Sequence, residues 1–439
     1  MKTELSRRAF LGTTAAVGLS ASHLIPVHAE PTSRPRRVMQ NSKISLGLIG
    51  CGGMGSANMR NLADHGEVQI TALCDVDDNR MGRDIEFSEQ REGRKPAIFK
   101  DYRKMLEMKE IDAVIVGTPD HWHALNLIHA VQAGKDAYCE KPISHNIVEA
   151  KAMAQAVRKY NKIVQVGTWQ RSTNEFYSAV DYIRSGKLGK VVLARAWKTD
   201  DFRMGKHSAG KPVPSTFDYN MWLGPASFTP YIAEYTHFQW RWFLNYGSGM
   251  TGDWGVHMMD IALLAMSKDT DMVMPTEVSA YGGKLAWPDD DRNAPDTHVA
   301  IMKFKDPDFV LHWETGRDHA DRPDHGTEFV AEDGKSLTVW RGGWKVRAAD
   351  GKPLPKEEKQ VPNDHWSNWL DCLKSRQQPR SHLESMAQTT IVCHLANAAL
   401  LAGTTVKWSK EKMDIVGKEG KETSSYRRTY RKGFELPKV

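Results

Sequence analysis

The chain has 439 residues, of which 40% are hydrophobic and 26% are charged, and this composition indicates a globular protein and excludes a disordered or membrane protein. A chain of this length exceeds the size at which one hydrophobic core stops growing, so we expect two domains. The 60 basic and 54 acidic residues nearly balance, and the net charge of +6 is too small to indicate a nucleic-acid-binding protein.

The first element in chain order is an N-terminal leader. Ser6-Arg7-Arg8-Ala9-Phe10-Leu11 precedes a mildly apolar stretch that ends before the small-residue site Val27-His28-Ala29. This order is typical of a twin-arginine signal peptide. We therefore expect a signal peptide at 1–29, a linker or arm at 30–42, and a mature protein exported in the folded state to the periplasm. No later segment is long and apolar enough to span a bilayer.

A short apolar run, Ile44 to Ile49, ends in Gly50-Cys51-Gly52-Gly53-Met54-Gly55, and a helix-compatible stretch from Ser56 to His65 follows. This strand, glycine and helix order is the dinucleotide-binding fingerprint G-x-G-x-x-G. The first glycine permits the tight turn, the second lets the backbone approach a pyrophosphate, and the third allows close helix packing. Phosphates would lie at the helix N-terminus.

A second strand, Val68 to Leu73, brings Asp75 to the position where an acid can hydrogen-bond the adenosine ribose hydroxyls. This position favours NAD over NADP. Arg80 keeps NADP open, because a basic side chain in the following loop can accept a 2′-phosphate.

The alternation of strand and helix continues through the first half of the chain. We expect a strand at 113–117, a ligand-facing loop from Thr118 to His123, a helix at 124–133, a strand at 136–139, and a helix at 146–160. Glu140-Lys141-Pro142 follows the strand at 136–139, and a proline there can hold a cis peptide. These elements predict a doubly wound α/β (Rossmann) domain over residues 43–165.

The remaining chain predicts an α+β domain over 166–415. Alternating segments at 191–197, 277–281, 299–304, 309–314 and 336–339 indicate a largely antiparallel, open-faced sheet. An apolar helix at about 386–401 is expected to pack back against the body. Residues 416–439 form a polar, basic tail without an assigned structure.

Several motifs taken together resemble the glucose–fructose oxidoreductase / inositol dehydrogenase (Gfo/Idh/MocA) family. They are the glycine fingerprint, Thr118-Pro119 with His123, Glu140-Lys141-Pro142, and the segment from Gly249 to Asp260 that contains Gly252-Asp253-Trp254-Gly255-Val256-His257. The resemblance implies a nicotinamide-dependent oxidoreductase of the exported type, acting on a sugar or glycoside. It also implies a homodimer or homotetramer formed through the open sheet.

The resemblance assigns roles residue by residue. Lys141 corresponds to the family's active-site lysine, Asp253 to the acid that orients the substrate, and His257 to the general base. The expected cofactor-binding residues are Gly50, Gly52, Gly53, Met54, Gly55, Asp75, Thr118, Pro119, His123, Glu140 and Lys141. The expected substrate-binding residues are Gln170, Arg171, Trp240, Arg241, Asp253 and His257.

Elementary chemistry agrees with these roles. Oxidation of a secondary alcohol needs a base for the hydroxyl proton while a hydride leaves the same carbon, and histidine has a suitable pKa. Asp253 and His257 are spaced i, i+4, so they would share one face of a helix. Because NAD is scarce outside the cytoplasm, we expect the cofactor to be loaded before export and to stay bound.

Two other functions remain open. A glycoside hydrolase or lyase could oxidise the sugar transiently, but the NAD-dependent glycosidases carry a Tyr/His-rich segment where this chain has Gly-Asp-Trp-Gly-Val-His. A non-catalytic nucleotide-binding sensor is the second alternative. The cluster His319, Asp321, Asp324 and His325 lacks the tight spacing of a metal site, so no metal is expected. The five scattered cysteines do not suggest a disulfide framework.

Overall fold

The computed structural model describes residues 43–268, 271–317 and 322–439. The expected signal peptide and arm, together with His319 and Asp321, lie outside these described residues, so those interpretations stay predictions. None of the described helices is both long enough and apolar enough to cross a membrane. All five cysteines are buried and free.

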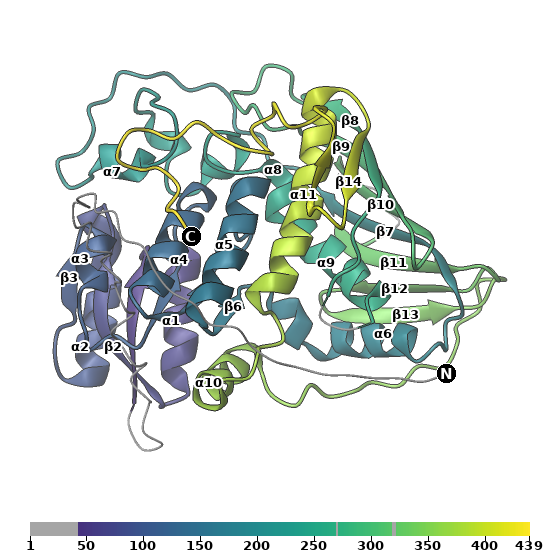
Figure 1. The fold of residues 1–439 in the computed structure, drawn as a ribbon, viewed down its shortest axis with the longest axis horizontal. Coiled ribbons are helices and arrows are strands. Elements are labelled where there is room, and N and C mark those ends of the chain that lie inside the picture. Colours follow the sequence, from purple (N-terminus) through teal and green to yellow (C-terminus); the bar gives the residue numbers. More distant parts are fainter. Residues whose placement is uncertain (1–42, 269–270, 318–321) are drawn as a thin grey trace, which may run out of the picture. The chain divides into compact units, whose positions relative to one another are not determined.

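A six-stranded parallel sheet forms the first layer (Figure 1). Its strands, in the order β3-β2-β1-β4-β5-β6, are β1 (Ile44–Ile49), β2 (Val68–Cys74), β3 (Ala97–Phe99), β4 (Ala113–Val116), β5 (Asp136–Cys139) and β6 (Val164–Val166). Every residue of β4 is buried, because helices cover both faces of such a sheet. The strand order reverses between β1 and β4, and ligands bind in the crevice at the carboxyl ends of strands at such a switch point.

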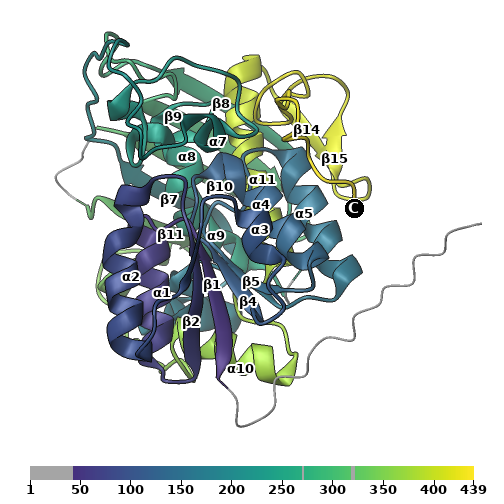
Figure 2. The same cartoon turned by 90° about the vertical axis from the view of Figure 1, so that its left-hand side faces the viewer.

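The helices of this layer lie on two faces of the sheet (Figure 2). They are α1 (Gly53–Asp64), α2 (Asp78–Glu92), α3 (Tyr102–Leu106), α4 (Asp120–Gln132) and α5 (Ile147–Tyr160). Helix α1 begins at Gly53, inside the glycine motif, and not at Ser56 as expected. Helix α4 begins at Asp120, so the expected ligand-facing loop up to His123 was wrong. Pro119 caps α4, and the acidic Asp120 in its first turn favours a helix start there.

A nine-stranded sheet forms the second layer, and its order is β13-β12-β11-β7-β10-β9-β8-β14-β15. Its strands are β7 (Val191–Thr199), β8 (Glu277–Gly283), β9 (Thr297–Phe304), β10 (Phe309–Gly316), β11 (His325–Ala331), β12 (Ser336–Trp340), β13 (Gly343–Arg347), β14 (Val406–Ser409) and β15 (Asp414–Val416). Only β7 and β10 run parallel among its described pairs. The largely antiparallel sheet is thus confirmed.

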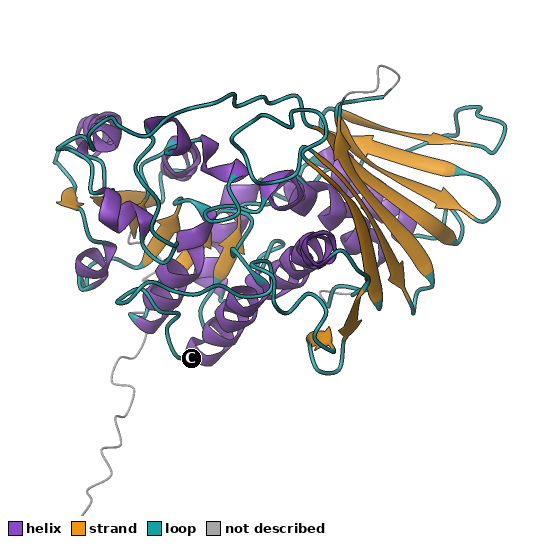
Figure 3. Ribbon diagram, turned by 90° about the horizontal axis from the view of Figure 1, so that it is seen from above, coloured by secondary structure: helices purple, strands orange, loops and turns teal. Residues whose placement is uncertain are grey.

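Three helices pack on one face of this sheet, while its other face carries no described helix (Figure 3). They are α6 (Asn174–Arg184), α9 (Gly255–Met266) and α11 (Leu383–Ala402). Helix α11 also contacts α5, as expected for a helix that packs back against the body. Helix α11 therefore links the second sheet to the nucleotide layer.

Strand β11 was not predicted, because it starts in a segment rich in Pro, Asp and His and contains Gly326. A Cβ on Gly326 would lie 2.5 Å from the Trp197 ring, so the neighbouring tryptophan occupies the space of a side chain. A glycine that looks like a strand breaker is here a packing residue.

The expected boundary between 165 and 166 falls inside β6, which pairs with β5 in the parallel sheet. Helix α10 (His365–Ser375) returns from the second half of the chain and buries Trp369 and Leu370 in the core of the nucleotide layer.

The polar tail also packs on this layer. Ser425 and Tyr426 accept hydrogen bonds at the start of α5, and the Phe434 ring meets Trp122 edge-on at 5.6 Å.

Candidate active site

The glycine turn after β1 leaves an open cradle at the start of α1. Gly50 has φ +91°, a conformation that disfavours any side chain. A Cβ on Gly55 would lie 2.1 Å from the Gly50 carbonyl oxygen, whereas a Cβ on Gly52 would meet nothing within 4 Å. The third glycine therefore allows close packing of helix on strand, and the second leaves space for a ligand. The residues present fit a dinucleotide.

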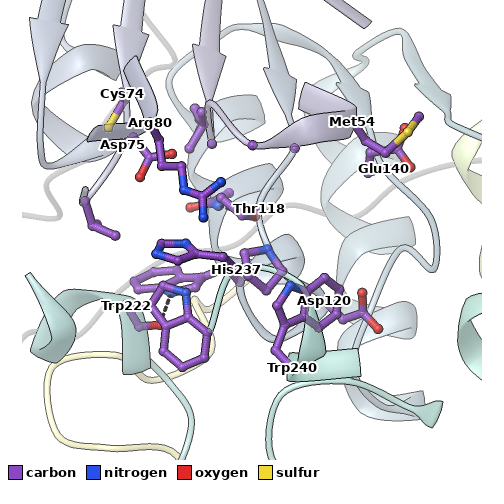
Figure 4. A pocket seen from close by; sticks show the side chains of 18 of the residues that line it. Met54, Cys74, Asp75, Arg80, Thr118, Asp120, Glu140, Trp222, His237 and Trp240 are labelled. Atoms are coloured by element: carbon purple, nitrogen blue, oxygen red, sulfur yellow. Dashed lines mark hydrogen bonds between the residues drawn. The ribbon is translucent and has the colours of Figure 1, made fainter. Parts of the chain in front are cut away.

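One end of the cleft is built around Asp75, directly after β2. Its carboxylate accepts hydrogen bonds from the backbone N–H groups of Cys51 (2.8 Å) and Asp77 (2.9 Å). Burial raises the pKa of Asp75 to about 6, despite these two bonds. Arg80 also lines the cleft, and its guanidinium forms no ion pair with any described residue. Figure 4 shows Asp75 and Arg80 side by side at this end.

The opposite wall comes from the segment between β7 and α8 (Gly249–Asp253), which includes α7 (Tyr219–Leu223) and the short 3-10 helix Gln239–Trp242. Trp222, His237 and Trp240 face the nucleotide layer (Figure 4). This wall is tied to the loop after β2 by hydrogen bonds from Asp218 N to Val76 O (2.9 Å) and from Asp78 N to Thr216 O (3.1 Å). The cleft between these two sides has a volume of about 1040 Å³, which includes space open to solvent.

The residues after β4 divide between lining the cleft and supporting it. Thr118 and Pro119 line the cleft, and Asn126 donates to the Thr118 hydroxyl at 3.0 Å. His123 is buried, and its ring nitrogens lie 2.7 Å from the carbonyl oxygens of Pro142 and Thr118. His123 therefore joins the two loops that carry Thr118 and Lys141, and it does not itself line the cleft.

Glu140 and Lys141 line the cleft beyond the glycine turn. Glu140 accepts a hydrogen bond from Asn58 at 2.7 Å, and a Cβ on Gly167 would lie 2.5 Å from its carboxylate. Burial raises the pKa of Glu140. The peptide between Lys141 and Pro142 is cis, as the sequence allowed.

Lys141 joins the two layers of the protein. Its ammonium donates to the Asp253 carboxylate at 2.7 Å and to the Asp253 carbonyl at 3.0 Å. Arg241, whose Nε lies 3.5 Å from the same carboxylate, is the second cation of this cluster. Burial alone would raise the pKa of Asp253, but the charges of Lys141 and Arg241 outweigh burial and hold that pKa below its usual value.

His257 lies one turn beyond Asp253, on a different helix. The expected continuous helix was wrong, because α8 ends at Asp253 and α9 begins at Gly255, with Trp254 between them. The His257 ring makes no hydrogen bond with any described residue, and its Nδ1 is a buried atom without a partner. Burial and the charges of Lys141 and Arg341 hold the pKa of His257 well below its usual value. The ring is therefore neutral and has a free lone pair.

The structure places the expected substrate-binding residues in different surroundings, and only some of them line the cleft. Trp240 and Arg241 line the cleft. Gln170 is buried and accepts hydrogen bonds from Arg341. Arg171 is not brought to the cleft, because its guanidinium forms a buried ion pair with Asp260 at 2.5 Å and donates to Ser385 at 2.9 Å.

Sequence reasoning missed two residues near this centre. Asp120 lines the cleft, and burial together with nearby Asp253 raises its pKa well above the usual value. Arg341, at the end of β12, contacts Gln170 and the Trp254 ring. The acid directly after Thr118-Pro119 was a usable signal for Asp120. No local signal marked Arg341.

Comparison with known proteins adds to this geometry. Residues 44–168 match the family description "Oxidoreductase family, NAD-binding Rossmann fold", and residues 189–434 match its C-terminal alpha/beta domain. The chain belongs to the Gfo/Idh/MocA oxidoreductase family. The doubly wound domain and the second sheet are thus the two parts that this family combines.

Curated members of the Gfo/Idh/MocA family resemble parts of the chain. An inositol 2-dehydrogenase from Rubrobacter xylanophilus is 30% identical over 161 residues, which cover 36% of this chain and 44% of the relative. A myo-inositol 2-dehydrogenase from Thermotoga maritima is 24% identical over 261 residues, covering 59% and 65%. A glycosyl hydrolase family 109 protein from Shewanella pealeana is 26% identical over 208 residues, covering 44% and 46%. The chain thus spans roughly half the length of these relatives.

Two solved structures share the fold over most of the chain. Levoglucosan dehydrogenase in complex with NADH and levoglucosan aligns with a TM-score of 0.64 at 18% identity, covering 83% of this chain and 99% of that one. The WlbA dehydrogenase from Bordetella pertussis, in complex with NADH and UDP-GlcNAcA, aligns with a TM-score of 0.63 at 17% identity, covering 84% and 99%. These alignments show the shared fold. Proteins named as dehydrogenases of levoglucosan and of inositols are among those that the chain resembles.

Proposed function

We propose that this protein oxidises a secondary hydroxyl of a sugar or glycoside, with the C3 hydroxyl of a glucoside as one candidate, using tightly held NAD. One observation carries the proposal. The Lys141 ammonium lines the nucleotide cleft and lies 2.7 Å from the Asp253 carboxylate. His257 follows Asp253 by four residues, and its ring forms no hydrogen bond with any described residue.

The residues of the first layer would hold the cofactor. The open cradle at Gly52 and the N-terminus of α1 suit the pyrophosphate, and Asp75 suits the ribose hydroxyls. NAD, when bound, would accept the hydride from the carbinol carbon. Asp75 favours NAD, whereas the free guanidinium of Arg80 is the feature that would accept the 2′-phosphate of NADP.

The chain's own groups would manage the proton. His257 is neutral, so it can accept the hydroxyl proton from the substrate. Lys141 can donate a hydrogen bond to the same oxygen and stabilise its developing negative charge. Asp253 fixes the direction of the Lys141 ammonium through two contacts.

The wall around Trp222 supports retention of the cofactor. His237 Nε2 lies 3.2 Å from the Asp77 carboxylate, and Arg431 of the tail bonds Asn220 behind the wall. Release of a dinucleotide would require these contacts to open. We infer that the cofactor is loaded before twin-arginine export to the periplasm, and that the open face of the second sheet forms a homodimer or homotetramer.

A hydrolase or lyase that oxidises its substrate transiently is the second candidate. It is favoured by the 26% identical relative named as a glycosyl hydrolase family 109 protein. The same Lys141, Asp253 and His257 would begin that reaction, but the cofactor would be regenerated within each turnover. Release of an aglycone without net NADH would distinguish it.

The test uses the purified holoprotein and a panel of sugars and glycosides. We expect the absorbance band of reduced nicotinamide to appear with at least one member of the panel. We expect this band to be lost in His257→Ala. His65→Ala is the matched control, because His65 lies at the far end of α1. A protein that holds nucleotide but reduces it with no member of the panel would be a sensor and would refute the proposal.

A further inference from the structure

A second group of side chains gathers around the indole of Trp254, which lies in the chain between Asp253 and His257. The Arg341 guanidinium lies 4.3 Å from the Trp254 ring centroid and 4.5 Å from that of Trp169. Lys198 Nζ lies 4.6 Å from the Trp254 centroid. These four side chains come from four separate segments and are each half-buried, so the group is accessible beside the proposed base.

Arg341 is held in place but is not saturated. Its Nε and Nη2 both donate to the Gln170 carbonyl oxygen, at 3.2 and 3.0 Å, while its Nη1 donates to no described residue. Gln170 is 1% exposed, and its amide Nε2 is a buried atom without a hydrogen-bond partner. Buried polar groups normally have partners. Gln170 therefore orients the guanidinium from its buried side, and the Nη1 group of Arg341 is the unused donor.

The charges of the group do not balance among the described residues. Asp253 already serves Lys141 and Arg241. Asp324 already pairs with Lys198, and it accepts a hydrogen bond from His325 at 2.6 Å. Arg341 has no carboxylate of its own within ion-pair distance, and burial lowers its pKa to about 10. The charges of Asp253 and Asp324 offset this burial only in part. A ligand carboxylate would give Arg341 the direct partner that the described residues do not supply.

We propose that Arg341, together with Gln170, binds a carboxylate of the substrate, so that the preferred substrate is a sugar acid or a glycoside of a uronic acid. This inference rests on the proposed function and specifies its substrate class. The planar guanidinium matches a carboxylate in two-bond geometry. The single positive charge of Arg341 balances the single negative charge of a carboxylate. A phosphate dianion would leave its second negative charge without a partner.

The test compares matched substrates on the holoprotein. Methyl glycosides of glucose, galactose and mannose are each paired with the corresponding methyl glycosiduronic acid, which differs only at C6. The 6-phosphates form a third series. We expect at least one acid to be used with a kcat/KM about 10- to 100-fold above that of its neutral partner, the range of a charge-assisted hydrogen bond. Its KM should rise with salt.

Variants assign the preference to Arg341. Arg341→Gln should reduce kcat/KM for the acid by about 10- to 100-fold more than kcat/KM for its neutral partner, while Arg341→Lys should recover part of this difference. Arg347→Gln, in the same hairpin with a hydrogen bond only to the exposed Gly351 carbonyl, is the matched control. Quenching of tryptophan fluorescence by the acid gives a readout of binding that does not depend on turnover.

Each outcome decides a separate point. Any of three results would overturn the carboxylate site: equal or better use of the neutral glycosides, better use of the phosphates, or parallel losses on both series in Arg341→Gln. In each of these cases the proposed oxidation would still stand. If no member of any series reduces the bound cofactor, the proposed function fails, and the inference fails with it.

Discussion

Replacing Asp253 by asparagine tests the centre of the site with the smallest change in shape. In the native protein its carboxylate accepts a hydrogen bond from Lys141 at 2.7 Å and lies 3.5 Å from Arg241. The side chains of Lys141 and Asp253 are only 13% and 17% exposed. The substitution therefore leaves two cations close together without the carboxylate that compensates them.

The expected loss of activity depends on the hydrogen bonds that Lys141 keeps in the variant. Loss of one positioned donor to a developing negative oxygen costs about 3–4 kcal/mol of transition-state stabilisation. The hydrogen bond from Lys141 to the main-chain carbonyl of residue 253, at 3.0 Å, is kept in the variant. We therefore expect a loss of about 2–3 kcal/mol in transition-state stabilisation, equal to a fall in kcat/KM of about 30- to 150-fold.

The assay is reduction of the bound nicotinamide at limiting substrate, with the melting temperature as a check on folding. Asp271→Asn is the matched control, because Asp271 pairs with Lys410 at 3.1 Å and both side chains are more than 60% exposed. An exposed pair contributes at most about 1 kcal/mol. Native kcat/KM in Asp253→Asn would refute the idea that this carboxylate positions Lys141.

Three further predictions concern the glycine turn, the wall of the cleft and the histidines. Gly55→Ala should cost about 1–3 kcal/mol of stability and reduce the bound nucleotide, because its Cβ would lie 2.1 Å from the Gly50 oxygen. His237→Ala should speed dissociation of NAD, measured by exchange with labelled nucleotide, by removing the contact to Asp77. The acid limb of kcat/KM should lie below pH 6.5, because burial lowers the pKa of His257.

Three results would contradict these predictions. A Gly55→Ala protein with native melting temperature and nucleotide content would contradict close packing of α1 on β1. Unchanged exchange in His237→Ala would show that the wall does not retain the cofactor. An acid limb at or above pH 6.5 would exclude His257 as a buried neutral base.

Stability should also fall in acid, and the sign follows from the buried histidines. Burial lowers the pKa of His123 to about 4 and that of His365 to about 3. Below pH 6.5 the unfolded chain binds these protons and the folded chain does not, so each histidine destabilises the fold by up to about 1.4 kcal/mol per pH unit down to its folded pKa. Urea unfolding at about pH 7 and about pH 5 measures this loss, and equal free energies would contradict it.

The sequence predicted the nucleotide layer well because its signals are local. The glycine turn needs no information beyond the motif, and Asp75 follows directly after a buried strand. The start of α4 was missed because Pro119-Asp120 looked like a loop, although a proline followed by an acid also begins a helix. Trp254 interrupts a segment whose spacing had suggested one helix.

The substrate side was less predictable because its contacts join distant segments. Gln170 and Arg171 are neighbours in the sequence, but the short 3-10 helix at 169–172 directs them to different environments. Gln170 accepts a hydrogen bond from Arg341, which follows β12, whereas Arg171 pairs with Asp260. No spacing rule connects residue 341 to residue 254. Arg341 follows β12, whereas Trp254 directly precedes α9, which packs on β7 and β11 of the same sheet.

The most direct test of the central claim follows one hydrogen atom. A reactive glycoside carrying deuterium on the carbinol carbon is mixed with the holoprotein, and the released nucleotide is analysed by mass spectrometry. Our account predicts deuterium on the nicotinamide ring in the native protein and none in His257→Ala. Oxidation of the glycoside with the deuterium found only in water would contradict hydride transfer to the cofactor.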